Sequence, residues 1–212
     1  YPVRSVSWFE AHAGRYQRVL YQVGNSYFHL HMFGLMQRIP GTVVLHDFYL
    51  SGAHSAAGDL AMQKELFHSH GWRGLQAAMQ DKAGALHDYP CNLSVLEAAQ
   101  GVIVHSHFAH DATRHWYGAD LARQIEAIPL LRGTMQLDRA AARARLGLDE
   151  NDFLVCTFGL LAPSKRNREL LDAWLQSALT QDAHCKLVFV GENHGGAYGD
   201  DLLATIKRSP GG

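Results

Sequence analysis

Five short runs of large apolar residues constrain the fold of this chain most strongly. Each run ends in glycine or polar side chains, and segments with apolar residues at helical spacing separate them. Near-continuous apolar strands that alternate with helices are typical of a parallel sheet covered on both faces. The sequence therefore predicts an α/β fold whose strands are buried on both sides. The five predicted strands lie in residues 18–23, 42–45, 101–104, 153–158 and 186–190.

The segments between these runs are predicted to be mainly helical. Bulky residues at mostly helical spacing continue until Pro40 and Gly41, and Asn92 is a plausible N-cap for a short amphipathic helix. Residues 51–88 are expected to form two or three helices, whereas 125–133 form a proline-containing stretch and 191–201 a glycine-rich surface loop. The predicted helices lie in residues 27–39, 51–88, 92–100, 138–148, 169–179 and from 200 onward.

The alternation restarts after a domain boundary, which we place between about residues 129 and 139. Residues 1–130 are predicted to form an N-terminal Rossmann-like domain, and 131–212 a partial C-terminal one. The second half reads as a strand, helix and strand with a repeat of roughly 30 residues, for which a right-handed crossover is expected in about 98 % of cases.

Composition excludes several classes of protein. The 212 residues carry a formal net charge of -1 and 18 % charged residues, whereas nucleic-acid binders concentrate Lys and Arg in excess of acids. The sequence lacks the run of about 20 apolar residues that a membrane-spanning helix needs. Three widely spaced cysteines, Cys91, Cys156 and Cys185, favour a reducing compartment over a disulfide framework. We therefore expect a soluble, cytoplasmic protein.

Polar residues follow the predicted strands at the edge where parallel sheets bind ligands. His46 and Asp47 come directly after the run Thr42–Leu45, and two ionisable groups are costly to bury there without partners. In extended backbone they point to opposite faces, so they are not expected to act on one atom. A site role is favoured; the alternative is that His46 bonds a backbone carbonyl while Asp47 caps the next turn.

The segment Phe158–Trp174 is a second candidate site. Lys165 and Arg166 lie in a loop that leads into a helix, and cations beside a helix N-terminus favour a phosphate group. The segment matches neither a Walker A loop nor GxGxxG, and a solvated basic loop is the alternative. Histidines such as His105, His107 and His110, or His29 and His31, lack recognised zinc spacing, so no metal is expected.

The ordered set of these motifs, from Leu20 to Ile206, resembles group 1 glycosyltransferases, retaining nucleotide-sugar enzymes of GT-B fold. The segments that carry the resemblance are LYQVGNSYFH, PGTVVLHDFYLSG, GVIVHSHFA, RARLGLDENDFLVCTFGLLAPSKRNRELLDAW and KLVFVGE. The resemblance implies two Rossmann-like domains, the second incomplete here, with the acceptor on the first, the nucleotide-sugar donor on the second and the reaction in a cleft between them. It also implies a role in polysaccharide or glycan biosynthesis.

The resemblance further implies roles for individual residues. Catalysis would involve His46, which approaches the transferred sugar, and its neighbour Asp47. No cofactor or metal is expected, because fixed cations can offset the charge that develops on the diphosphate. The donor diphosphate would bind at Gly159, Lys165 and Arg166, and the acceptor side would comprise Gly24, Asn25, Ser26, His29 and Ser106.

The sequence also departs from the family pattern. Leu160 and Leu161 stand where many members carry an arginine, so charge neutralisation would fall to Lys165 and Arg166. The family's Glu-x7-Glu segment is expected downstream of residue 212, so we expect a fragment that is inactive by itself. A GT-B nucleotide-sugar epimerase and a non-catalytic sugar- or nucleotide-binding module remain alternatives. The donor, the acceptor and any peripheral membrane association are not readable from the sequence.

Overall fold

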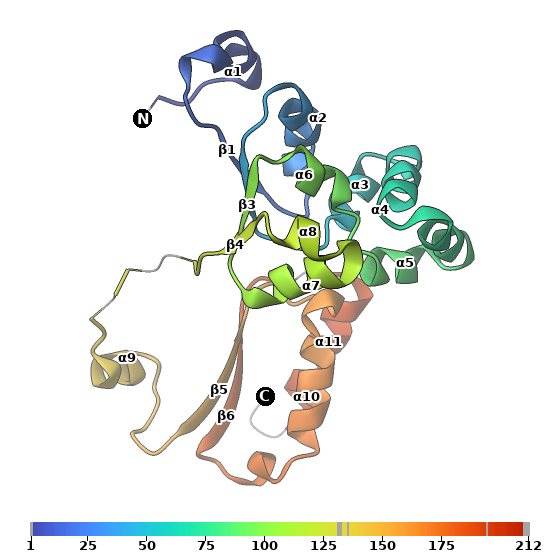
Figure 1. Ribbon diagram of the computed structural model, residues 1–212. Helices are drawn as coiled ribbons and strands as arrows, with labels where there is room; N and C mark the ends of the chain where they lie inside the picture. The colour runs from blue at the N-terminus through green and yellow to red at the C-terminus, as the bar shows by residue number, and fades with distance from the viewer. Residues whose placement is uncertain (1, 131–132, 135, 194, 210–212) are drawn as a thin grey trace. The chain divides into compact units, whose positions relative to one another are not determined.

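The computed structural model describes residues 2–130, 133–134, 136–193 and 195–209 (Figure 1). The chain divides into two compact units, Tyr1–Arg132 and Gly133–Gly212, which we call unit 1 and unit 2. The division falls inside the interval in which the sequence places a boundary. Each unit contains its own parallel sheet, so a mixed α/β fold of Rossmann-like character is confirmed.

Unit 1 is built on a four-stranded parallel sheet in the order β1-β2-β3-β4. Three of these strands were predicted, and the fourth, β4, was not. Its three residues, Ile-Glu-Ala, are too few to form a recognisable apolar run in the proline-containing stretch. The strands are β1 (Leu20–Val23), β2 (Thr42–Leu45), β3 (Gly101–Val104) and β4 (Ile125–Ala127).

Helices connect each strand of unit 1 to its parallel neighbour (Figure 1). Before β1 lie α1 (Val6–His12) and the short 3-10 helix η1 (Ala13–Arg15); η2 (Tyr27–His29) and α2 (Leu30–Arg38) precede β2; α3 (Ser51–Ala56), α4 (Asp59–Gln80), α5 (Lys82–Asp88) and α6 (Leu93–Ala98) precede β3; α7 (His107–Tyr117) and α8 (Ala119–Ala122) precede β4. Two or three helices were predicted for the region 51–88, and the structure has three there, of which α4 is divided by a kink at Gly71.

One face of the unit 1 sheet forms the main core. Tyr21, Val23 and Val104 are buried there with residues of α2, α6 and α7, whereas Leu20 on the opposite face of β1 is 56 % exposed. Gln22 is exposed as well. The prediction that every strand is buried on both faces was therefore wrong. A run of apolar residues predicts a strand, but it does not show whether helices cover one face of that strand or both.

Asn92 precedes α6, as predicted, but its side chain does not cap the helix. It is fully buried; its Nδ2 donates to the carbonyl oxygen of Phe48 at 2.5 Å, and its Oδ1 accepts from the hydroxyl of Tyr117 at 2.7 Å. The amide thus ties the loop after β2 to α7. A buried amide gains more from satisfying both of its polar groups than from one capping bond.

Unit 2 contains the predicted strand, helix and strand. The strands β5 (Phe153–Phe158) and β6 (Cys185–Val190) are parallel, and Leu161, Leu171 and Leu202 form a buried apolar cluster beside them. The helix after β6 begins at Gly196, so the C-terminal part of the predicted loop 191–201 is helical, while residue 194 lies outside the described residues. The other elements are α9 (Arg139–Arg145), η3 (Pro163–Lys165), α10 (Asn167–Leu175), η4 (Ala178–Gln181) and α11 (Gly196–Arg208).

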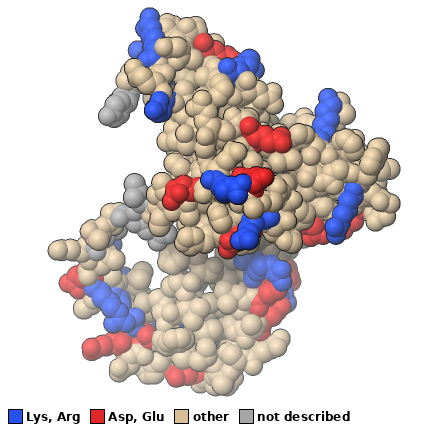
Figure 2. All heavy atoms as spheres, viewed as in Figure 1, with Lys and Arg blue, Asp and Glu red and all other residues tan. Residues whose placement is uncertain are grey.

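Charged side chains of both signs are interspersed on the face that Figure 2 shows, without a broad basic area in either unit. Among the described residues, no helix combines the length and apolar character needed to cross a membrane.

Candidate functional site

Residues after β1 and β2 are joined by hydrogen bonds at one edge of the unit 1 sheet. Oδ2 of Asp47 accepts the backbone N–H of Asn25 at 2.8 Å. Oδ1 of Asn25 in turn accepts the backbone N–H of Ala53, in the first turn of α3, at 2.9 Å. Asp47 therefore orients the loop after β1 rather than capping its own turn, and Asn25 fixes the start of α3.

Gly24 lies in the middle of this arrangement, and only a residue without a side chain fits there comfortably. A Cβ added to Gly24 would lie 3.0 Å from Cε1 of His29 and 3.1 Å from Oδ2 of Asp47. Oγ of Ser26 lies 3.0 Å from Nδ1 of His29. Four residues predicted for the acceptor side, Gly24, Asn25, Ser26 and His29, are thus gathered beside Asp47.

His46 belongs to a different set of contacts. Its Nε2 lies 2.6 Å from Oε1 of Gln22, and its Nδ1 lies 3.2 Å from Nε2 of His105. Nδ1 of His105 lies 3.0 Å from the carbonyl oxygen of Ile128. His46 and Asp47 thus have separate partners, and the alternative in which His46 bonds a backbone carbonyl is not what the structure shows. Both side chains remain exposed.

Gln22 and His105 were not predicted as partners of His46. The signal lies in strand register: Val44 pairs with Ile103, so two residues later His46 stands beside His105 on the same face. Gln22 is the partner of Val44 in β1 and shares that face. These pairings require the strand order, which the sequence alone did not supply.

Ser106 has fewer contacts with the other predicted site residues than these have with one another. It stands immediately before α7, is exposed, and its side chain makes no capping hydrogen bond. His107 is the first residue of α7, so it does not share a strand face with His105. Of the described contacts, none joins Ser106 to His46 or Asp47.

A network of buried polar groups joins α4 to α6. Oε1 of Glu65 accepts from the hydroxyl of Ser69 at 2.7 Å and from the backbone N–H of Ser94 at 3.2 Å. Burial lowers the pKa of His70 to about 4, against a smaller opposite effect of Glu65. Burial, assisted by Glu65, raises the pKa of the Cys91 thiol to about 12. Cys91 is therefore protonated and unsuited to nucleophilic chemistry, which relies on the thiolate.

In unit 2 the loop after β5 brings Lys165 back to Gly159. A Cβ added to Gly159 would lie 3.9 Å from Cε of Lys165, and Gly159 has a φ of 121°, which favours glycine. Oδ1 of the buried Asn167 accepts the backbone N–H of Ala162 at 3.0 Å and holds the loop closed. The structure therefore brings together two residues of the predicted diphosphate site.

The cation beside Lys165 is already paired. Nε of Arg166 lies 2.5 Å from Oε1 of Glu169, and both side chains are exposed. Lys165 is exposed too, and the described residues offer it no ion pair. The N-cap residues of α10 and α11 make no side-chain capping hydrogen bond, but in the first turn of α10 the backbone N–H of Arg168 donates to the hydroxyl of Tyr198 at 3.0 Å. The start of α10 is therefore already partly satisfied. Lys165 is therefore the principal candidate for a phosphate contact.

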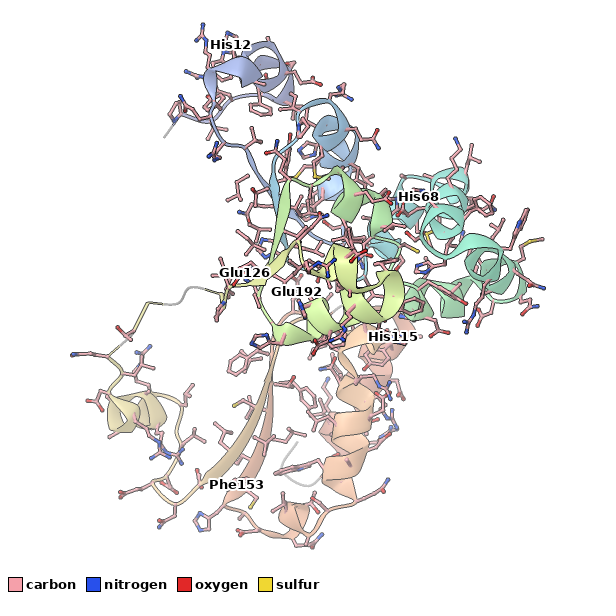
Figure 3. The ribbon with its side chains drawn as sticks, in the orientation of Figure 1. His12, His68, His115, Glu126, Phe153 and Glu192 are labelled. Atoms are coloured by element: carbon pink, nitrogen blue, oxygen red, sulfur yellow. The ribbon has the colours of Figure 1, made fainter. Side chains whose placement is uncertain are left out.

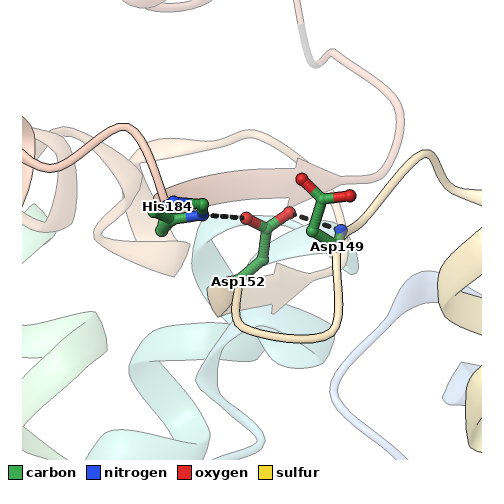
Figure 4. Close-up of side chains that lie close together, drawn as sticks. All are labelled: Asp149, Asp152 and His184. Carbon is green, nitrogen blue, oxygen red and sulfur yellow. Dashed lines mark hydrogen bonds and ion pairs between the residues drawn. The ribbon is translucent and has the colours of Figure 1, made fainter.

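Asp149, Asp152 and His184 lie close together at the other end of β5 and β6 (Figure 4). The side chain of Asp152 is only 1 % exposed and pairs with Lys186; it also accepts the backbone N–H of Asp149 at 2.8 Å and lies 3.2 Å from Nδ1 of His184. The hydrogen bond from Lys186, followed by that from Asp149, lowers the pKa of Asp152 to about 2. The carboxylate of Asp152 therefore links the residue before β5 to Lys186 of β6.

A cavity of about 570 Å³ in unit 2 is distinct from the Lys165 loop. It is lined mainly by apolar side chains, including Leu171, Trp174 and Leu187, and it reaches Cys185, the register partner of Phe153. It extends from that end of the sheet, marked by Phe153, along β6 as far as Phe189, whereas Glu192 follows the opposite end of β6 (Figure 3). Lys186 is the one Lys or Arg among the described residues that line the cavity, and it pairs with Asp152, so several free cations do not converge there.

No protein-family model matches this chain, and no curated protein matches it. The chemistry of the site must therefore be argued from its own residues.

Proposed function

We propose that this chain is a retaining glycosyltransferase of GT-B type, in which unit 2 binds the nucleotide-sugar donor and unit 1 binds the acceptor. The observation that carries the proposal is the position of Lys165 beside Gly159, after β5 and before the start of α10. Two successive parallel α/β units, as described above, agree with the two-domain plan of that fold. Free cysteines at positions 91, 156 and 185 agree with a cytoplasmic location.

The proposed chemistry assigns Lys165 to the leaving group. Breaking the bond between the anomeric carbon and phosphate leaves negative charge on the diphosphate, and a fixed ammonium group stabilises this charge as it develops. Arg166 contributes less, because Glu169 already offsets its charge. Backbone N–H groups at the start of α10 supply further positive potential.

In unit 1 the proposal assigns the acceptor to the edge formed by Gly24, Asn25, Ser26 and His29. Asp47 orients this edge through Asn25, and His46 presents its exposed ring on the other side of the strand. His46 and Asp47 are the proposed catalytic residues. Ser106 is retained as an acceptor-side residue at the start of α7.

Binding of pyrophosphate tests the assignment of Lys165 without knowledge of the sugar. Titration calorimetry should show that Lys165→Ala weakens binding about tenfold or more, which corresponds to about 1.4 kcal/mol. Arg166→Ala should weaken it less. Lys207→Ala, an exposed lysine in the last turn of α11, is the matched control. Equal pyrophosphate affinity for wild type and Lys165→Ala would refute the assignment.

Assays with UDP-, GDP- and ADP-sugars test the reaction itself, in a protein that also carries the expected Glu-x7-Glu segment. The proposal expects release of the nucleoside diphosphate to depend on an added glycan acceptor and on Lys165. Release without any acceptor would favour an epimerase or hydrolase instead. Binding of a nucleoside diphosphate without turnover of any donor would favour a binding module.

A further inference from the structure

His46 and His105 directly follow β2 and β3, and their rings lie side by side with centroids 5.1 Å apart and planes tilted by 38°. The outer nitrogen of each ring already has a partner. Nδ1 of His105 lies 3.0 Å from the carbonyl oxygen of Ile128, which can only accept a hydrogen bond. Nε2 of His46 lies 2.6 Å from Oε1 of Gln22, also an acceptor. With the Gln22 amide oriented so that its Oε1 faces His46, both outer nitrogens carry hydrogen.

This requirement leaves the inner nitrogens with lone pairs when both rings are neutral. Nδ1 of His46 and Nε2 of His105 are 3.2 Å apart, the distance of a hydrogen bond, yet neither has a hydrogen to donate. Two lone pairs at this separation repel each other. A positive species between the rings would remove the repulsion, and both rings are reachable because His46 is exposed and His105 is half-buried.

The spacing suits a metal ion. Zinc binds imidazole nitrogen at about 2.0–2.1 Å, and two ligands of a tetrahedral ion at that distance are about 3.3 Å apart. Histidine ligands of metals commonly donate their other N–H to a backbone carbonyl or a similar acceptor, which fixes the ring and its tautomer. Ile128 and Gln22 meet this requirement for His105 and His46 respectively.

We propose that His46 and His105 bind a divalent transition metal ion through Nδ1 and Nε2 respectively. Imidazole ligands favour Zn²⁺, Cu²⁺ and Ni²⁺ over Mg²⁺ and Ca²⁺. Two protein ligands leave the remaining coordination positions to water or to a bound molecule. The site departs from the sequence-based expectation of no metal, and it does not rest on the proposed glycosyltransferase function, since it depends only on strand pairing within unit 1.

Zinc titration tests the site directly. The chain, prepared without a polyhistidine tag, is titrated with Zn²⁺ alone by calorimetry near neutral pH. His105→Ala should weaken the tightest binding event at least tenfold, and Gln22→Ala, which removes an outer partner, should weaken it about tenfold. His107→Ala removes a nearby exposed histidine that is outside the pair and should bind as wild type does. Wild-type affinity in His105→Ala would overturn the proposal.

Nitrogen NMR of the histidine rings provides a second test that needs no variant to fold. Zn²⁺ should shift Nδ1 of His46 and Nε2 of His105 while their outer nitrogens keep their hydrogens. Unchanged ring nitrogens in the presence of Zn²⁺ would also overturn the proposal. That result would mean that the Gln22 amide is turned, with its NH₂ donating to His46 and an ordinary hydrogen bond joining the rings.

Discussion

The carboxylate of Asp47 accepts the backbone N–H of Asn25 at 2.8 Å, so a residue that follows β2 fixes the loop that follows β1. We predict that Asp47→Ala lowers the free energy of unfolding of unit 1 by about 1–2 kcal/mol, because it leaves that N–H without its charged acceptor. Urea unfolding followed by tryptophan fluorescence measures the change.

Two controls separate the hydrogen bond from the charge. Asp47→Asn keeps an oxygen that can accept and should retain most of the stability. Asp111→Ala removes a carboxylate of α7 that is 75 % exposed and contacts only His110 among the described residues, so it should change little. If Asp47→Ala were as stable as wild type, the contact would not order the loop.

The close approach of the loops after β5 and β6 gives a second prediction. A Cβ added to Gly191 would lie 1.8 Å from the carbonyl oxygen of Gly159, a backbone atom that cannot move aside without breaking the pairing of the strands. Gly191→Ala should therefore destabilise unit 2 by about 3 kcal/mol or more. Thermal unfolding measures this, with Gly133→Ala as the control because its Cβ meets nothing within 4 Å. Equal melting of the two variants would contradict the prediction.

The sequence predicted the strands that are rich in large apolar residues, and it placed His46, Asp47 and Lys165 after them. It missed β4, whose residues Ile125–Ala127 include a glutamate and form no apolar run. It could not identify His105 as the neighbour of His46, because that pairing depends on the order β2-β3 and on register. Features that depend on neighbouring residues in the sequence were therefore easier to predict than contacts between residues of different strands.

The sequence also could not predict whether one or both faces of a sheet are covered by helices. The same kind of apolar run supplies β2, in which Val44 is buried, and β1, in which Leu20 is 56 % exposed. Strand composition reflects the average environment, whereas burial depends on which helices pack against each face. The ion pair of Arg166 with Glu169 could be suspected from their i, i+3 spacing, yet only the structure shows that it forms.

Acid should destabilise unit 1 through His70. Burial lowers its pKa from 6.5 to about 4, so between these values the unfolded chain binds a proton that the folded chain does not. Stability therefore falls as the pH decreases through this interval, by about 3 kcal/mol at most, and this contribution levels off below it. His70→Gln should flatten the dependence, whereas His87→Gln, at an exposed position of α5, should not. Urea midpoints measured across the interval decide between these outcomes.

Asp152 should make unit 2 sensitive to stronger acid, in a separate range of pH. The hydrogen bond from Lys186 lowers the pKa of Asp152 from 3.8 to about 2, so its stabilising contribution is fully present above the unfolded value and is lost as the pH falls toward the folded one. Asp152→Asn should lower the melting temperature near neutral pH, since it leaves Lys186 without its carboxylate, and it should remove the acid-sensitive step below about pH 4. Asp149→Asn is the matched control, because Asp149 donates its backbone N–H to Asp152 and its carboxylate makes no hydrogen bond to Asp152 or Lys186 among the described contacts. Melting temperatures of both variants are measured at neutral pH and across the acid range. If the two variants showed the same dependence on pH, the role of Asp152 would be contradicted.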